Sequence, residues 1–252
     1  MPIVDLSSSI APSHPDAASF ERVEVTYSSH AQGASQIETM LGVPRKLLRD
    51  EEGWAVEEIK LSTHSVTHLD APWHYNSKIQ GEPAATIDEL PLDWFFSDGV
   101  VLDMTHKTDE DKIDVEDVVA SLSAIGYSLK PRDIVLVRTG RDAFYGRPDY
   151  SRRGCAVTAA ATRWLYEQGV RVMGIDAWGW DGPLFRQAIE AGERQQAGIF
   201  WAAHQADLPY SQIERLVNLG SLPPFGFKVA CFPLKIKSGS AAPARVVAIL
   251  PD

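Results

Sequence analysis

Three histidines and one aspartate fall within the segment 64–74, and their spacing limits how this segment can fold. His64, His68, Asp70 and His74 all occupy even positions, whereas the apolar residues just before them occupy odd positions. Alternate side chains of an extended strand point to opposite faces. The spacing therefore predicts a strand that carries the imidazoles and the carboxylate on one face.

A helix is the alternative, because His64 and His68 at i and i+4 would also converge on one side. The neighbouring residues favour the strand, since Val66 and Thr67 are β-branched and a helix interior does not tolerate Pro72. Imidazole nitrogens and carboxylate oxygens are ordinary ligands for zinc, manganese or iron. The cluster predicts a metal site, with hydrogen-bonded histidines lining a pocket or an interface as the alternative reading.

The segment resembles the motif His-x-Gly-Thr-His-x-Asp-x-Pro-x-His of the metal-dependent cyclase and hydrolase family, which includes kynurenine formamidase, isatin hydrolase and trans-dienelactone hydrolase. Every named position matches except one, where Val66 replaces the glycine. A glycine there would relax the backbone or leave room beside the site. We therefore expect Val66 to alter loop geometry, pocket volume and substrate range.

Two residues further along the chain are similar to a later part of the same family. Glu214 follows His204 by ten positions, and the pair resembles the downstream His and the Glu of the family's Glu-x-Leu-x-Asn-Leu element. The resemblance implies that His64, His68 and Asp70 hold one metal ion. It also implies that Asp70, His204 and Glu214 hold a second or partly occupied ion, so that each subunit binds one or two Zn²⁺ or Mn²⁺ ions.

A metal held in this way would polarise a substrate carbonyl and acidify water. The family uses the position of His74 as a proton shuttle, which suits the ordinary pKa of histidine, and a ligand role is the alternative. The sequence has no Gly-x-Ser-x-Gly element, reactive-cysteine signature or phosphate-binding glycine loop. We predict a metal-dependent hydrolase of an amide, lactam or lactone carbonyl. A non-catalytic metal-binding protein and a metal-dependent cyclase or isomerase are the alternatives.

Aromatic residues near the predicted site residues in sequence indicate a small aromatic or heterocyclic substrate. The predicted substrate-binding residues are Trp73, Tyr75, Trp178 and Trp201. Their alternative role is to fill a core or a subunit interface. Asp176 and Asp181 are candidates to support the metal ligands, with ordinary turn roles as the alternative.

Outside the motif, the pattern of apolar residues predicts a mixed α/β chain. Helical spacing predicts helices over 115–125 and 159–168, and a polar, helical insertion over 182–198. Strands are expected over 20–27, 54–61, 99–103, 132–138, 170–176, 225–236 and 245–250. The strand over 20–27 alternates as a half-buried strand does. The resemblance implies a single swivelling β/β/α-type domain over 1–252 with a central barrel-like mixed sheet, assembled as a homodimer or homotetramer.

Composition narrows the class of protein and its partners. With 252 residues, 44% hydrophobic and 23% charged, the chain is typical of soluble globular proteins. Its formal net charge of -10 argues against nucleic acid or an anionic membrane as a partner. Cys155 and Cys231 form no disulfide or metal-binding pattern, and we expect both to be buried. No targeting signal or membrane-length apolar run is present, so we expect a cytoplasmic protein.

Overall fold

The structure is a computed structural model that describes residues 1–15, 17 and 22–252. The chain forms two compact units, which are described separately. Unit 1 comprises residues 1–9 and 63–252, and unit 2 comprises residues 10–62. The beginning of the strand predicted over 20–27 lies outside the described residues.

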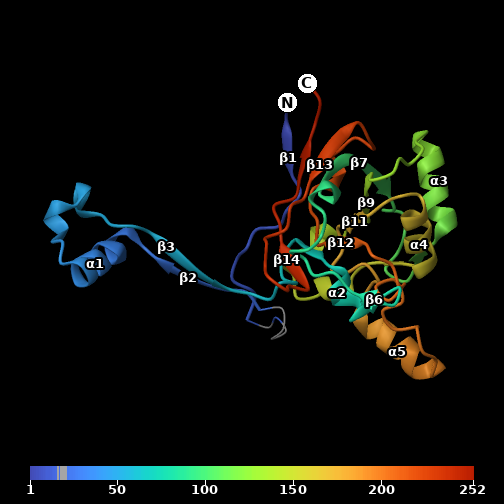
Figure 1. Ribbon diagram of the computed structural model, residues 1–252, viewed down its shortest axis with the longest axis horizontal. Coiled ribbons are helices and arrows are strands. Elements are labelled where there is room, and N and C mark those ends of the chain that lie inside the picture. Colours follow the sequence, from blue (N-terminus) through green and yellow to red (C-terminus); the bar gives the residue numbers. More distant parts are fainter. Residues whose placement is uncertain (16, 18–21) are drawn as a thin grey trace. The chain divides into compact units, whose positions relative to one another are not determined.

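Unit 1 is built on one curled sheet in which nine strands of the described chain take part (Figure 1). In sheet order the strands are β1 (Ile3–Asp5), β15 (Val247–Ile249), β13 (Phe227–Ala230), β7 (Phe96–Asp103), β9 (Ile134–Arg138), β11 (Val172–Ile175), β12 (Ser211–Glu214), β4 (His68–Asp70) and β14 (Ala241–Pro243). The strands β7, β9, β11 and β12 run parallel, and the remaining pairs are antiparallel. The predicted mixed α/β fold with a barrel-like sheet is confirmed.

Helices α3 (Val115–Ile125) and α4 (Ala159–Glu167) begin where the sequence predicts them. Asp114 and Thr158 accept hydrogen bonds from the first backbone N–H groups of the two helices, which satisfies donors that have no partner within the helix. Their apolar residues pack on one face of the sheet, and a second apolar cluster covers the other face. The central strands β9 and β11 are buried almost throughout, which explains their continuous apolar or small-residue sequences, and the buried β12 carries the polar residues Gln212 and Glu214.

The remaining elements of unit 1 are short or lie at its edge. They comprise helices α2 (Pro72–Tyr75) and α5 (Leu184–Arg194), and the paired strands β5 (Lys78–Ile79) with β6 (Glu82–Pro83) and β8 (Lys112–Ile113) with β10 (Ala156–Val157). Short 3-10 helices span Leu92–Trp94, Arg141–Phe144, Tyr150–Arg152 and Leu219–Ser221. The helix α5 confirms the helical insertion predicted over 182–198.

Unit 2 consists of an antiparallel pair, β2 (Glu24–Ser28) and β3 (Val56–Lys60), with helix α1 (His30–Leu41) and the 3-10 helices Arg45–Leu47 and Arg49–Glu51 between them. The sequence pattern did not predict α1. A capping box formed by Ser29 and Gln32 begins it, and Gly42 ends it in the left-handed conformation. In the described part of 20–27 the predicted half-burial holds at Val23, which is buried, and at Val25, which is partly buried, but fails at Tyr27, which is 60% exposed.

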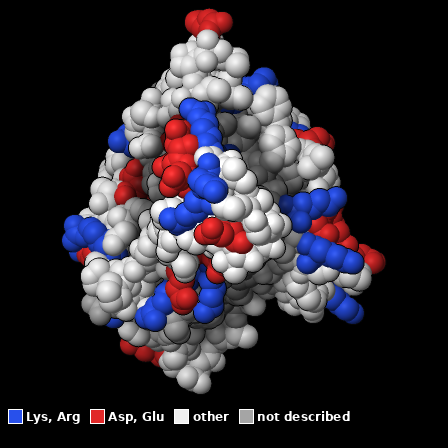
Figure 2. All heavy atoms as spheres, turned by 90° about the vertical axis from the view of Figure 1, so that its left-hand side faces the viewer, with Lys and Arg blue, Asp and Glu red and all other residues white. Residues whose placement is uncertain are grey.

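Two predictions from composition can be compared with the described residues. Cys155 and Cys231 are both buried, as expected. No helix in the described part of the chain has the length and apolar character needed to cross a membrane. On the face of the molecule shown in Figure 2, basic and acidic side chains lie interspersed rather than gathered by sign.

Candidate metal centre

Strand β4 places His68 and Asp70 at the middle of the site. It pairs antiparallel with β12, and the register sets His68 opposite Glu214. Side chains of directly opposite residues lie on the same face of an antiparallel pair. The register therefore brings His68 Nε2 to 3.7 Å from Glu214 Oε2. The backbone N–H of Trp180 donates to the other oxygen, Oε1, at 3.0 Å and holds the carboxylate in place.

The prediction of one strand across 64–74 is wrong outside 68–70. Residues 64–67 form a turn, and Pro72 occupies the first turn of α2, where its missing N–H costs no helical hydrogen bond. His64 thus comes from a turn and His74 from a short helix. Their side chains still converge, with ring centroids 3.9 Å apart, and His64 Nδ1 lies 2.8 Å from Asp70 Oδ1.

Val66 has a backbone conformation that glycine adopts far more readily. Its φ is +54°, which is strained for a β-branched residue and explains why the family motif has glycine at this position. The Val66 carbonyl accepts a hydrogen bond from His68 Nδ1 at 2.9 Å. This bond directs His68 Nε2 toward the carboxylates, so the turn fixes the orientation of the imidazole.

His204 is oriented by a carboxylate. Its Nδ1 donates to Asp181 Oδ2, and the backbone N–H of Ala203 donates to Asp181 Oδ1 at 2.6 Å. His204 Nε2 then lies 3.7 Å from Asp70 Oδ2 and 3.8 Å from Glu214 Oε1. Asp181 therefore acts on the site through His204, in agreement with its predicted supporting role.

Three buried ligand atoms of the site, Asp70 Oδ1, Asp70 Oδ2 and His68 Nε2, form no hydrogen bond of regular geometry within the described residues, although imidazole nitrogens lie 2.8–3.7 Å from the Asp70 oxygens. Buried polar atoms are almost always paired, so these three imply a missing partner. The site contains two groups of three residues, and within each group the ligand atoms lie within 4.8 Å of one another. One group is His64, Asp70 and His74, and the other is His68, Asp70 and Glu214. Imidazole and carboxylate atoms that converge at this spacing fit a divalent metal.

The electrostatics of the cluster agree with a site for a cation. Burial opposes ionisation of Asp70, but the nearby imidazoles of His74 and His68 hold its pKa well below the ordinary value. Burial lowers the pKa of His204, yet the Asp181 carboxylate outweighs this effect and raises it to about 10. Burial, with the charge of Asp70, raises the pKa of Glu214. Burial also lowers the pKa of His74 to about 4, which departs from the ordinary histidine pKa on which the predicted proton-shuttle role relied.

The site has a closed side and an open side. The closed side comprises the buried residues His68, Asp70, His204 and Glu214, and the open side comprises the partly exposed residues His64, His74 and Trp201. The Trp201 ring stacks on the His204 ring, with centroids 4.5 Å apart. It forms a T-shaped contact with the His74 ring, with centroids 4.8 Å apart. Gln187 of α5 accepts the Trp201 backbone N–H at 2.8 Å. Trp201 therefore forms a wall beside the open side.

The other predicted substrate-binding residues lie elsewhere. Tyr75 is only 2% exposed and packs edge-on against His204, beneath the site. Trp73 follows Pro72 on α2 and is 44% exposed, and the Trp178 ring lies under the guanidinium of Arg215. Among the four aromatic residues, Trp201 has the placement that best suits contact with a bound substrate.

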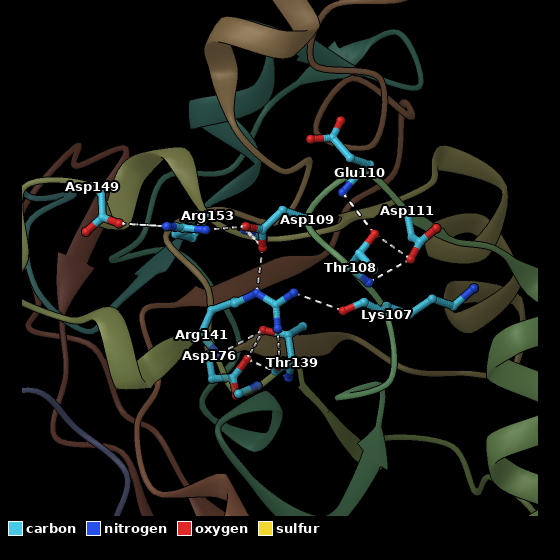
Figure 3. Close-up of polar contacts among 12 residues, drawn as sticks. Lys107, Thr108, Asp109, Glu110, Asp111, Thr139, Arg141, Asp149, Arg153 and Asp176 are labelled. Carbon is cyan, nitrogen blue, oxygen red and sulfur yellow. Dashed lines mark hydrogen bonds and ion pairs between the residues drawn. The ribbon is translucent and has the colours of Figure 1, made fainter.

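Asp176, the other predicted supporting residue, belongs to a separate network (Figure 3). Its carboxylate accepts hydrogen bonds from the backbone and hydroxyl of Thr139 and from the backbone of Gly140. Burial outweighs these bonds and raises its pKa to about 6. In the same network Arg141 and Arg153 both bind Asp109. Asp176 thus stabilises the turn after β9.

Several supporting contacts had no signal in the sequence. Ser240 Oγ lies 3.0 Å from His64 Nε2, and the Val66 carbonyl and Gln187 act as described above. Ser240 and Gln187 are ordinary polar residues distant in sequence from their partners, by 176 and 14 positions. The glycine position of the motif, which Val66 occupies, was the one signal available for the unusual turn.

Comparison of the sequence with known proteins identifies one matching family and relatives that are kynurenine formamidases. The model of the family described as "Putative cyclase" matches residues 4–182. A kynurenine formamidase from Erythrobacter litoralis (strain HTCC2594) is 31% identical over 213 residues, which cover 80% of this chain and 84% of that protein. A kynurenine formamidase from Salinibacter ruber (strain DSM 13855 / M31) is 27% identical over 251 residues, covering 98% and 97% of the two chains.

The fold is also found among solved structures. Isatin hydrolase A from Labrenzia aggregata, bound to benzyl benzoate, superimposes with a TM-score of 0.76. The match covers all of this chain and 94% of that chain, at 23% sequence identity. The extent of the match shows that the two chains share an overall fold.

Proposed function

This chain belongs to the cyclase family matched above, as its sequence predicts, and we propose that it is a metal-dependent hydrolase that cleaves an amide C–N bond in a small aromatic or heterocyclic substrate. One observation carries the proposal. Both oxygens of the buried Asp70 form no hydrogen bond of regular geometry within the described residues, and imidazoles of both the closed and the open side converge on them. The kynurenine formamidase relatives support the predicted hydrolase class.

The ligand groups that share Asp70 suit one or two divalent ions. As the sequence predicts, His64, His68 and Asp70 would hold one ion and Asp70, His204 and Glu214 a second, whereas the ligand atoms that lie nearest one another group His64 with Asp70 and His74, and His68 with Asp70 and Glu214. Imidazole favours zinc, whereas a carboxylate-rich set also accepts manganese. A divalent metal supplies Lewis acidity, which polarises a carbonyl oxygen and acidifies water.

Two residues of the open side, His74 and Trp201, handle protons and substrate. His74 lies beside His64 and faces the edge of Trp201, so its imidazole is placed next to a substrate that rests against that wall. We assign to His74 the removal of a proton from the attacking water and its delivery to the amide nitrogen that leaves. The Trp201 ring then holds a flat aromatic group against the site.

The protein assembles, in this proposal, as a homodimer or homotetramer, and its substrate is a small molecule. The cytoplasmic location remains a prediction from the sequence. Neither the oligomeric state nor the cellular location is needed for the proposed reaction, and each can be measured directly.

Metal analysis and a substrate panel test the proposal together. Elemental analysis of the purified protein should find about one or two Zn or Mn ions per chain. An N-formyl-aniline, an isatin and an aryl lactone should then be compared, with the release of product followed by absorbance. We expect hydrolysis of at least one amide substrate, and loss of activity on chelation with recovery after metal is restored. Activity that survives complete removal of metal would contradict the proposal.

A further inference from the structure

Strand β12 carries polar side chains in a position where a buried strand is usually apolar. Ser211 and Gln212 of this strand are fully buried, and so is Tyr210, which directly precedes it. A buried polar group costs free energy unless it forms a hydrogen bond. Since the proposed function uses only Glu214 of this stretch, the other three polar residues need an explanation of their own.

Ser211 and Tyr210 each bind the backbone beside a predicted metal ligand. Ser211 Oγ donates to the carbonyl oxygen of Asp70 at 2.6 Å. The Tyr210 hydroxyl donates to the carbonyl oxygen of Ala203, the residue before His204, at 2.9 Å. The strand that carries Glu214 is therefore tied to the chain at both of the other ligands.

The tie to Ala203 matters most, because His204 lies outside the regular elements. Residues 201–206 form turns and a bend, so no sheet ladder or helix fixes their backbone. The Ala203 carbonyl also accepts the N–H of Ala206 at 3.2 Å, but that bond stays within the same turn. The Tyr210 hydroxyl instead connects this turn to the sheet.

The peptide group between Ala203 and His204 is held at both of its polar atoms. Its carbonyl oxygen accepts from Tyr210, and its N–H donates to Asp181 Oδ2 at 3.2 Å. A trans peptide is planar and points these two groups in opposite directions. Two bonds on opposite sides therefore restrict rotation of the peptide plane, and with it the direction of the His204 side chain.

Gln212 determines how the Tyr210 hydroxyl is oriented. Its Nε2 donates to Tyr210 Oη, so the oxygen acts as an acceptor there and its own hydrogen is left for the Ala203 carbonyl. In the register of β12 with β4, Gln212 lies opposite Asp70 and on the same face. The chain of bonds thus begins beside Asp70 and ends beside His204.

The packing around Tyr210 separates the role of its hydroxyl from the role of its ring. The Tyr75 ring lies between the Tyr210 ring, at a centroid distance of 5.0 Å, and the His204 ring, at 5.3 Å. His204 Nε2 lies 3.8 Å from Glu214 Oε1. Because bonds from zinc to its ligands are about 2.0–2.2 Å long, a shared ion tolerates little error in that spacing.

We propose that Tyr210 is a positioning residue, which holds His204 in place for a metal ion through the carbonyl of Ala203, with Gln212 orienting its hydroxyl. The proposal rests on the proposed role of His204 as a metal ligand. It adds a residue that contacts neither the metal position nor the substrate wall.

Hydrogen exchange of the metal-free protein tests the tie itself. Tyr210→Phe keeps the ring and removes only the hydroxyl, so the backbone amides of 201–206 should exchange about 10-fold faster by mass spectrometry. Tyr150→Phe is the matched control, because the buried Tyr150 hydroxyl also donates to a backbone carbonyl, that of Asp176, at 3.1 Å. Unchanged exchange in Tyr210→Phe, or an equal increase in the control, would overturn the proposal.

Competition with a chelator then tests the effect on the metal. Tyr210→Phe should bind Zn²⁺ about 10-fold more weakly than wild type, a loss similar to that for other residues that orient a ligand. Tyr150→Phe should bind Zn²⁺ as wild type does. Unchanged affinity in Tyr210→Phe would overturn the positioning role even if its exchange is faster. A wild type that binds no Zn²⁺ would instead contradict the proposed function, and the positioning role with it.

A double-mutant cycle tests the part assigned to Gln212. Its Oε1 forms no hydrogen bond of regular geometry within the described residues, so Gln212→Met chiefly removes the bond to Tyr210. If Gln212 acts through that hydroxyl, Gln212→Met should weaken Zn²⁺ binding in wild type and add little to Tyr210→Phe. Effects that multiply fully in the double variant would exclude this connection.

Discussion

The closed and open sides of the candidate metal centre are built in different ways. On the closed side, each residue is fixed by sheet register, by a backbone carbonyl or by a carboxylate, as the pairing of His68 with Glu214 and the contact of His204 with Asp181 show. On the open side, His64 comes from a turn and His74 from a short helix. We infer that the closed side, together with His64, sets the metal affinity and that His74 and Trp201 of the open side set proton transfer and substrate choice.

The largest expected effect is that of Asp70→Asn, because Asp70 joins the two sides. The amide presents one neutral oxygen and one N–H group where the carboxylate presents two charged oxygens. We expect loss of bound metal and a fall of at least about 10³-fold in kcat/KM, or about 4 kcal/mol. Elemental analysis and kinetics measure the two quantities. Retention of stoichiometric metal by this variant would place the ion elsewhere.

His74→Ala should separate the two sides most clearly. If His74 transfers protons, the variant keeps its metal and loses about 10²- to 10⁴-fold in kcat. His68→Ala is the comparison on the closed side and should lose metal as well as activity. Loss of metal from His74→Ala would instead identify His74 as a ligand, consistent with its grouping with His64 and Asp70.

The difference between the two sides also explains what the sequence could predict. The residues of the motif were recognisable because their types and spacing are local, and the structure brings them together. The extent of the strand could not be predicted, because Val66 takes a positive φ and Pro72 starts a helix. Both conformations depend on the surrounding packing. Contacts such as Gln187 with Trp201 join separate segments and leave no periodic pattern.

Helices show the same distinction between local and distant information. The bounds of α3 were predictable because Asp114 and Gly126 mark its two ends in the sequence. The helix α1 has comparable caps, but its exposed apolar residues obscure the amphipathic pattern on which the prediction relied. Exposed apolar residues on a helix therefore weaken the usual sequence signal.

Asp181→Asn tests a smaller contribution to the closed side. The amide can still accept a hydrogen bond from His204 Nδ1, but it lacks the charge that favours this orientation. We expect metal affinity to fall about 10- to 100-fold, which competition with a chelator would measure. Asp176→Asn is the matched control, since its carboxylate binds the turn at Thr139 and should leave metal affinity unchanged. Equal affinities in the two variants would exclude a specific role for Asp181.

Val66→Gly should have the smallest effect, and it probes the turn between the two sides. Loss of a buried side chain and added chain entropy are destabilising, but relief of the positive φ offsets roughly 1–2 kcal/mol of that loss. We expect a net change in unfolding free energy below about 1 kcal/mol by urea denaturation. Val101→Gly, buried in β7, is the control and should cost about 3 kcal/mol. Equal losses in the two variants would mean that Val66 is unstrained.

The placement of Trp201 outside the sheet has a consequence for protein engineering. The strands β4 and β12 carry His68, Asp70 and Glu214, whereas Trp201 is held by its neighbours and by Gln187 of α5. Substitutions confined to 184–201 would therefore reshape the wall while leaving these strands unchanged. A combinatorial library of residues 184–201 should therefore yield variants that accept new substrates and keep the same metal chemistry.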